Sequence, residues 1–138
     1  MIKTSIFLLL LVALFNEAYE SGKVCNGYDL TLRFKGEFLC QGQPSKTVKL
    51  YLESCILETG FCKKYIPELN QTGDVTTVTS PTIIDIFDEF DLIVEHECGQ
   101  CTGAFKIPIS EAAINCKNLP GGKIDDLKTI ELADEKYC

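Results

Sequence analysis

Tyr28-Asp29-Leu30-Thr31-Leu32-Arg33-Phe34-Lys35 is the stretch of sequence that decides the fold class of this chain. Its apolar and polar residues alternate without a break, which is the period of a strand that buries one of its two faces. We expect the even-numbered side chains to point into a core and the odd-numbered ones to point to solvent. A half-buried strand therefore opens the folded part of the chain.

The rest of the chain repeats this pattern in short segments that turn residues separate. Further strands are expected at residues 38–40, 48–53, 75–79, 90–98, 105–109 and around 130–132. The segment 55–69 has no sustained period, and we interpret it as a loop with one short edge strand near 60–66. Many short strands with little helix predict an all-β sandwich in one domain.

Four local signals refine this picture. Gly36 interrupts the first alternation, and Leu127 is out of phase with Ile130, which indicates a β-bulge. Pro108 indicates an edge strand or a strand end, because proline cannot donate to the ladder. The segment 110–116 predicts one short helix, with Ser110 as its cap.

The first residues have the layout of a secretory signal peptide. Lys3 precedes an apolar run at residues 6–15, which is shorter than the roughly 20 residues that a membrane-spanning helix needs. Cleavage after Ala18 is expected, which leaves residues 19–138 as a secreted, extracellular domain that does not span a membrane. A cut a few residues later is the alternative, since Asn16 is a poor occupant of the position three residues before the cut.

The cysteine count predicts a disulfide framework. The chain has 8 cysteines, all downstream of the expected cut, in a compartment where thiols pair. They are Cys25, Cys40, Cys55, Cys62, Cys98, Cys101, Cys116 and Cys138. A local bridge between Cys55 and Cys62 is the one pairing that we predict.

Charge narrows the class of partners. The formal net charge is −7, which repels the phosphate backbone of nucleic acid. Binding to anionic lipid would need a local basic patch, and the sequence offers none that is evident. We expect no nucleic acid partner.

Three segments, in this order, resemble the nematode transthyretin-like family. They are KGEFLC at 35–40 followed by Pro44 and VKLY at 48–51, then LIVEHEC at 92–98, and then FKIP at 105–108. Together with the leader and a cysteine at the C-terminus, the resemblance covers most of the chain from about residue 28 to residue 138.

This resemblance implies a transthyretin-like sandwich of two sheets that is exported from the cell. It carries over Cys40, Cys98, Cys101 and Cys138, and it implies that the other four cysteines form a second set of bridges. Family members mostly lack a defined biochemical activity, and some act as bridges between membrane lipid and a receptor. The segments 55–69 and 83–91 depart from the family pattern.

Two motifs have both a chemical and a structural interpretation. His96 is the only histidine, but no Gly-x-Ser-x-Gly elbow accompanies it, so we favour a buried, hydrogen-bonded strand histidine over a catalytic base. Cys98-Gly99-Gln100-Cys101 has the spacing of a redox dithiol, or with His96 of part of a metal site. Because a strand follows the motif, structural disulfides are the favoured interpretation.

The remaining candidate residues are surface features. An acidic group could hold calcium but lacks an Asp-x-Asp-x-Asp-Gly loop, so we expect a solvated face; it comprises Asp85, Asp88, Glu89, Asp91, Glu95 and Glu97. Asn70-Gln71-Thr72 is an N-glycosylation sequon, expected on an exposed turn. Tyr51, Phe87 and Phe90 are the aromatic residues that could form a contact surface, although core packing also explains Phe90.

We therefore expect a non-enzymatic extracellular binding protein without a cofactor or a metal. Its partner would be an extracellular protein, a cell-surface receptor, or, by resemblance alone, a lipid. One alternative is a carrier of a small apolar ligand at an oligomer interface, although the outward charges Arg33, Lys35, Lys49 and Glu53 tend to protect strand edges. A second alternative is a dithiol oxidoreductase that uses Cys98 and Cys101.

Overall fold

The computed structural model describes residue 25 and residues 29–80, 87–110, 113–116 and 123–138. The expected leader 1–18 lies outside the described residues. The described chain is almost entirely β-structure. Its elements are β1 (Leu30–Cys40), β2 (Gln43–Pro44), β3 (Lys49–Ile56), β4 (Phe61–Tyr65), β5 (Glu68–Thr72), β6 (Val75–Thr79), β7 (Glu89–Cys98), β8 (Cys101–Pro108), β9 (Ile114–Cys116), β10 (Ile124–Glu131) and the 3-10 helix η3 (Glu135–Tyr137).

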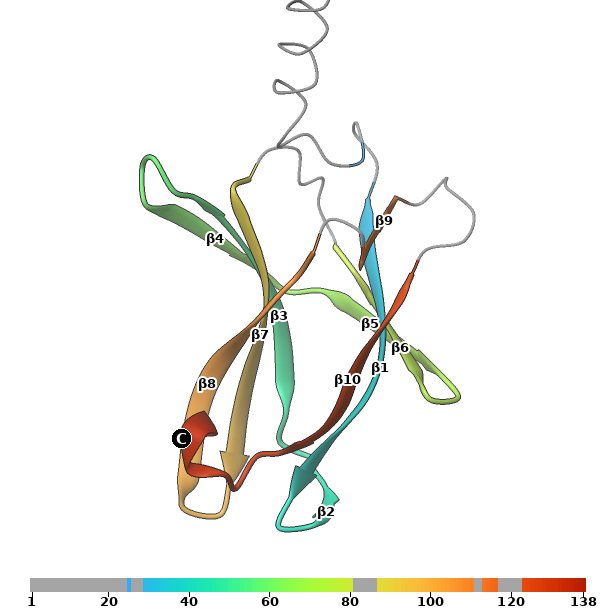
Figure 1. Cartoon of the computed structure of the whole chain (residues 1–138), viewed down its shortest axis with the longest axis vertical. Coiled ribbons are helices and arrows are strands. Elements are labelled where there is room, and N and C mark those ends of the chain that lie inside the picture. Colours follow the sequence, from blue (N-terminus) through green and yellow to red (C-terminus); the bar gives the residue numbers. More distant parts are fainter. Residues whose placement is uncertain (1–24, 26–28, 81–86, 111–112, 117–122) are drawn as a thin grey trace, which may run out of the picture.

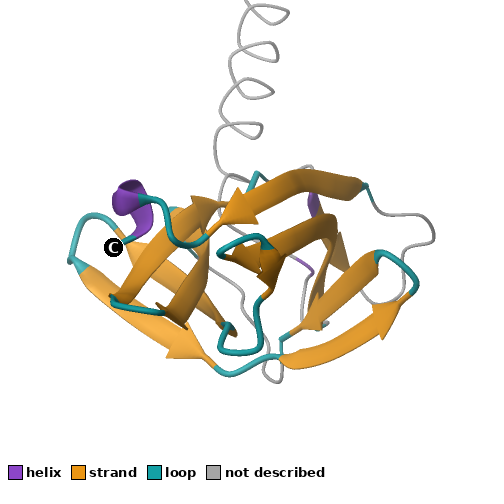
Figure 2. Cartoon of the chain, turned by 90° about the horizontal axis from the view of Figure 1, so that it is seen from below, coloured by secondary structure: helices purple, strands orange, loops and turns teal. Residues whose placement is uncertain are grey.

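The strands form two sheets that face one another (Figures 1 and 2). One sheet has the order β10-β1-β6-β5, with β2 and β9 also paired to β1, and the other has the order β4-β3-β7-β8. The last strand, β10, runs parallel to β1, while the other pairs are antiparallel. The predicted all-β sandwich is thus confirmed.

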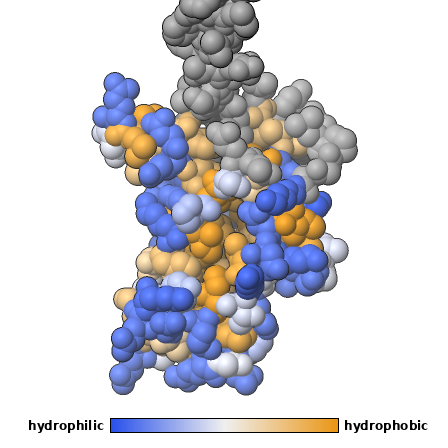
Figure 3. Space-filling model, in the orientation of Figure 1, coloured by the Kyte–Doolittle hydropathy of each residue, from blue (hydrophilic) through white to orange (hydrophobic). Residues whose placement is uncertain are grey.

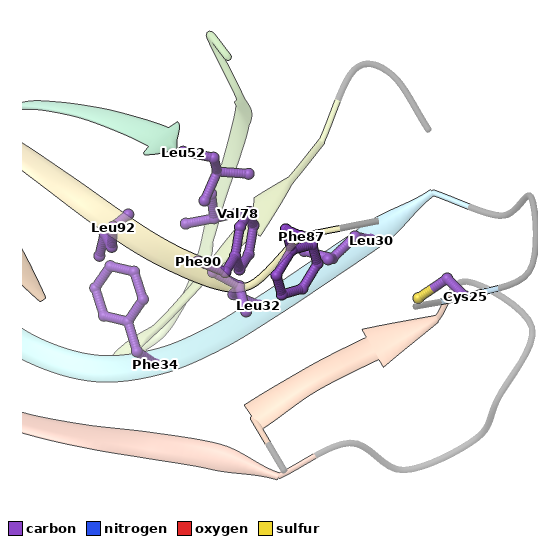
Figure 4. Packing of buried hydrophobic residues seen from close by; sticks show 9 residues of the cluster. All are labelled: Cys25, Leu30, Leu32, Phe34, Leu52, Val78, Phe87, Phe90 and Leu92. Carbon is purple, nitrogen blue, oxygen red and sulfur yellow. The ribbon is translucent and has the colours of Figure 1, made fainter. Parts of the chain in front are cut away.

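Alternation along β1 builds one wall of the core. Leu30, Leu32 and Phe34 are 0%, 4% and 4% exposed, as the period of two requires. They pack against Leu52, Val78, Phe90 and Leu92 from other strands and against Phe87, which precedes β7 (Figure 4). Burying each of these side chains stabilises the fold by about 1.5–3 kcal/mol, so the even-numbered face of β1 is a large part of the driving force.

The predicted irregularity near Gly36 and Leu127 is a bulge between β1 and β10. The register passes from Lys35 opposite Asp126 to Glu37 opposite Thr129, so Gly36 faces two residues. On the longer side, Lys128 has a positive φ of 58°, and its N–H donates to Asp126 Oδ1 at 2.8 Å. A Cβ at position 36 would lie 3.0 Å from the Leu127 Cβ and 3.1 Å from the Lys128 carbonyl oxygen, so a side chain there would require the bulge to shift.

The helix expected at 110–116 is wrong over its second half, although the Ala113 N–H donates to the Ser110 carbonyl at 3.0 Å in a single 3-10 turn. Ile114–Cys116 is the strand β9, which pairs with β1 so that Cys116 lies opposite Leu30. The disulfide between Cys25 and Cys116 holds this segment against the sheet. Tertiary pairing therefore overrides the local helical pattern; residues 111–112 lie outside the described part.

The segment 55–69 is more regular than its sequence indicated. The expected edge strand near 60–66 is present as β4, but Glu68 and Leu69 belong to a further strand, β5. The register of β3 and β4 places Cys55 opposite Cys62, and the two are bridged as predicted. Asn70 lies within β5 and not on a turn, because the turn of that hairpin is at Gly73 and Asp74.

Four disulfides use every cysteine. The bridges are Cys25–Cys116, Cys40–Cys98, Cys55–Cys62 and Cys101–Cys138. They separate into the two sets of four cysteines that the family resemblance implied. Cys40–Cys98 joins the ends of β1 and β7, and so it links one sheet to the other.

The C-terminal turn is clamped onto β8. Cys138 is bridged to Cys101, and the Tyr137 ring lies 4.3 Å from the Phe105 ring. A Cβ on Gly103 would overlap the Tyr137 carbonyl oxygen, so only glycine lets the turn approach so closely. Figure 1 shows this end of the chain against β8.

We predict that the disulfide between the sheets stabilises the fold more than the hairpin disulfide. The bridges close sequence separations of 58 and 7 residues, for which the chain-entropy account gives about 4.2 and about 2.4 kcal/mol. Cys98 and Cys55 are similarly buried at 2% and 3%, so truncating these two side chains costs a similar packing loss, while Cys40 is half-buried and Cys62 is exposed. Urea unfolding should show C40A/C98A to be less stable than C55A/C62A by about 2 kcal/mol; equal losses would contradict the entropic account.

We predict that Gly103→Ala destabilises the chain by about 1–3 kcal/mol, the usual cost of overpacking. The added methyl displaces the carbonyl of Tyr137 and with it the C-terminal turn. Chemical denaturation measures the loss, and the NMR signals of Tyr137 should shift. Ala104→Ser is the matched control, because Ala104 follows Gly103 directly and its side chain is exposed. An equal loss of stability in the two variants would contradict the close contact between Gly103 and the C-terminal turn.

Candidate functional site

Four large apolar side chains remain exposed along one continuous segment of the chain. Leu57, Phe61, Ile66 and Leu69 are 62%, 61%, 75% and 53% exposed. They lie on the tip of the β3–β4 hairpin, on the linker after β4 and on β5. The strands β4 and β5 are each at the edge of one of the two sheets. Hydrophobic atoms are visible at the hairpin tip in Figure 3. We call these four residues the apolar edge.

The hairpin that carries the apolar edge is held in one conformation. The Cys55–Cys62 disulfide crosses it, and Gly60, which has a φ of 67°, donates its N–H to the Ile56 carbonyl at 2.9 Å. The Leu57 N–H donates to Asp88 Oδ2 at 2.7 Å, which ties the tip to the chain just before β7. The exposure of Leu57 and Phe61 is therefore a property of the folded structure.

The contact surface predicted at Tyr51, Phe87 and Phe90 is not where the exposed apolar side chains lie. Phe87 and Phe90 are 8% and 3% exposed, stack on one another with ring centroids 4.9 Å apart, and belong to the core. Tyr51 is half-buried beneath Lys64, whose Nζ lies 3.9 Å from the ring centroid. The available signal was the set of apolar residues in the segment 55–69 that fitted no strand period.

A ladder of charged side chains covers the outer face of the sheet β4-β3-β7-β8. Lys64 forms an ion pair with Glu95, and Lys106 forms one with Glu53. The Lys106 Nζ also lies 3.9 Å from Asp91 Oδ2. Asp91 was expected on a solvated face, yet Asp91 and its neighbour Ile93 are only 7% and 6% exposed. They do lie on the outer face, but the long side chains beside them on neighbouring strands cover them.

The ladder sets the ionisation of its members. Donation by Lys64 lowers the pKa of Glu95, and the bond to Glu53 raises the pKa of Lys106. Burial raises the pKa of Asp91, with Lys106 opposing this effect. Asp91 is thus the carboxylate in the ladder whose negative charge the fold disfavours.

At one end of the ladder the surface is hollowed, with a volume of about 390 Å³. Thr47, Lys49, Glu95, Glu97 and Thr102 contribute to its lining together with the small residues Gly103 and Ala104. The lining thus mixes charged and hydroxyl groups with apolar atoms, and it does not single out one class of ligand.

His96 lies on the opposite, inner face of the same strand. It is 2% exposed, and its Nε2–H donates to the Tyr137 carbonyl at 2.8 Å, while its ring lies edge-on to Phe105. The prediction of a buried, hydrogen-bonded strand histidine is confirmed. Its role is to hold the C-terminal turn, which the sequence did not indicate.

Cys98 and Cys101 face one another across the β7–β8 turn but belong to different bridges, to Cys40 and to Cys138. The motif therefore forms two structural disulfides and no dithiol couple in this fold. Neither sulfur is available as a metal ligand. This is the structural interpretation that the following strand favoured.

The acidic residues are dispersed in the described part of the chain. Asp88 accepts a hydrogen bond from the backbone of the hairpin tip, while Asp91 and Glu95 lie in ion pairs with lysines. Asp85 lies outside the described residues. Among the described residues, the one group with ligand atoms close together is Glu53, Cys55 and Cys62, whose two cysteines are bonded to each other.

The described residues contain no helix that is long and apolar enough to cross a membrane. Comparisons of the chain with protein families, with curated proteins and with solved structures give no match.

We predict that Asp91→Asn stabilises the protein at neutral pH and has no effect in acid. The pKa of Asp91 in the folded state lies above its ordinary value of 3.8, so the folded state binds the proton more tightly than the unfolded state. The wild type therefore loses stability as pH rises through that folded pKa, whereas asparagine does not titrate.

Denaturant unfolding at a series of pH values checks this prediction. The advantage of the variant should shrink as pH falls through the folded pKa and vanish below 3.8. Asp74→Asn, in an exposed pair with Lys35, controls for the loss of one negative charge. A difference between D91N and wild type that does not depend on pH would contradict the prediction.

Proposed function

We propose that this chain is a secreted, disulfide-stapled binding protein of transthyretin-like architecture, which recognises another extracellular protein through its apolar edge. The observation that carries the proposal is the exposure of Leu57 and Phe61 on a hairpin that a disulfide fixes, with Ile66 and Leu69 exposed on the chain that follows it. Large apolar side chains that a folded structure leaves exposed are candidates for a contact site.

The energetics of such a contact suit a rigid hairpin. Each large apolar side chain that a partner covers contributes about 1.5–3 kcal/mol. Because the Cys55–Cys62 bridge has already ordered the hairpin, little conformational entropy remains to be lost on binding. A few such side chains in the centre of an interface can supply most of its affinity.

Charge near the apolar edge describes the partner further. The segment 55–69 carries Lys63 and Lys64 against Glu58 and Glu68, so this region is close to neutral on a chain whose net charge is −7. A partner with an apolar contact face and a rim of mixed charge complements it.

The proposed extracellular location rests on the sequence and the bridges. Residues 1–18 have the layout of a leader, and four disulfides are typical of proteins that fold in an oxidising compartment. The sequon at Asn70 lies on an exposed strand, where a glycan could be attached.

The carrier and oxidoreductase alternatives have less support. The space between the sheets is only about 20 Å³, which is too small for a ligand. The surface hollow of about 390 Å³ has the charged side chains Lys49, Glu95 and Glu97 in its lining, which disfavour a purely apolar ligand. An oxidoreductase would need Cys98 and Cys101 to exchange their present partners.

We predict that Phe61→Ser with Ile66→Ser weakens partner binding at least tenfold and leaves folding intact. Losing two buried apolar contacts costs about 1.5–3 kcal/mol each, whereas both side chains are exposed in the free protein. The measurement is surface plasmon resonance of the secreted wild-type protein and the variant against an array of purified receptor ectodomains.

Lys123→Ser, at an exposed position outside the apolar edge, is the control and should bind like wild type. Vesicles of phosphatidylcholine, with and without phosphatidylserine, run in parallel. Saturable binding to an ectodomain that the double variant retains would contradict the proposal. So would binding to vesicles alone, which would replace a protein partner with lipid.

A further inference from the structure

The four strands that end the two sheet orders, β10, β5, β4 and β8, differ in how they are protected, while β2 and β9 beside β1 have only two and three residues. An unprotected edge offers free N–H and C=O groups to a strand of another molecule, and charged residues or proline prevent this. β4 carries Lys63 and Lys64, and β8 carries Lys106 and ends at Pro108. β10 carries Asp125, Asp126, Lys128 and Glu131.

The fourth edge, β5, lacks such protection. Its sequence is Glu-Leu-Asn-Gln-Thr at 68–72, so its one charge is at the first residue. All five residues are exposed, and among the described strands β5 pairs with β6 alone. This strand is therefore the edge of the described fold that is most open to strand addition.

The strand is also complementary to a second copy of itself. An antiparallel pair of β5 strands centred on Asn70 sets Leu69 opposite Gln71 and Glu68 opposite Thr72. No like charges meet in this register, unlike a pair of β4 strands centred on Lys63. Two copies could thus continue the sheet β10-β1-β6-β5 through a two-fold axis.

The sequon lies at the centre of this strand. Leu69 is opposite Val78, which is fully buried in the core, so Leu69 lies on the core-facing side of the sheet. Successive side chains point to opposite faces, so Asn70 points to the outer face, where it is exposed. A glycan on Asn70 consequently points away from Leu69.

We propose that Asn70 carries an N-linked glycan whose structural role is to block pairing of β5 with a second copy, so that the secreted chain remains a monomer. In the self-paired register the two Asn70 Cβ atoms would be about 4.5–5.5 Å apart, which leaves no room for two oligosaccharides. The glycan does what lysines do on β4. The proposal rests on the secretion that the proposed function includes.

The modification itself is a balanced group transfer. A bond forms between Asn70 Nδ2 and C1 of the first sugar, and the bond from C1 to the oxygen of a lipid pyrophosphate donor breaks. The amide loses one proton, and the lipid pyrophosphate leaves. Thr72 supplies the hydroxyl that the sequon requires, and its side chain is exposed too.

The test uses the full chain secreted from a eukaryotic host in four forms: wild type, N70Q, T72A and T72S. N70Q and T72A each remove the sequon by a different residue, while T72S keeps it. Intact mass reports the glycan and the absence of free thiols, and sedimentation over a dilution series reports the oligomeric state. We expect wild type and T72S to be glycosylated monomers, and N70Q and T72A to be unglycosylated and to reach twice the monomer mass reversibly.

A further variant identifies the surface involved. Gln71→Lys on the N70Q background places a charge on the bare edge and should restore the monomer, while F61S with I66S on that background should leave the dimer intact. A secreted, leader-free wild type without a glycan overturns this proposal and leaves the proposed function standing. A monomeric N70Q, or a dimer that Gln71→Lys does not disrupt, overturns it as well.

Discussion

The fold depends on β1, because almost every part of one sheet is paired to this strand. Its first half pairs with β6 on one side and with β9 on the other, and its second half pairs with β10 and β2. The same strand presents Leu30, Leu32 and Phe34 to the core. A one-residue slip would turn that face to solvent, so the alternation of β1 fixes both the pairing and the core.

The disulfides fix what β1 alone cannot. Cys40 ends β1 and joins it to β7, so the strand that organises one sheet is bonded to a central strand of the other. Cys25–Cys116 holds β9 beside the start of β1, and Cys101–Cys138 returns the C-terminus to β8. A domain of this size has few apolar contacts to spare, and bridges that close long loops compensate for them.

The sequence predicted those parts of the fold whose signal is local. The alternation of β1, the buried histidine, the Cys55–Cys62 hairpin bridge and the bulge near Leu127 can each be deduced from a few adjacent residues. The strand β9 could not, since its conformation depends on pairing with a distant strand. The parallel placement of β10 and the coverage of Asp91 by side chains from neighbouring strands likewise depend on tertiary structure. The apolar edge was missed because exposure cannot be deduced from a segment that lacks a period.

The two edge strands joined by residues 66–67 have different tasks, and their sequences differ accordingly. β4 combines Phe61 with two lysines, so its side chains can bind a partner while its charges discourage strand addition. β5 has polar, uncharged residues around Leu69, which would leave its backbone open to pairing. Because neighbouring side chains alternate between faces, an outer-face group on Asn70 and a core-side contact at Leu69 can coexist on one strand. The five residues of β5 can thus both protect the sheet edge, through a group on Asn70, and contribute Leu69 to a contact with a partner.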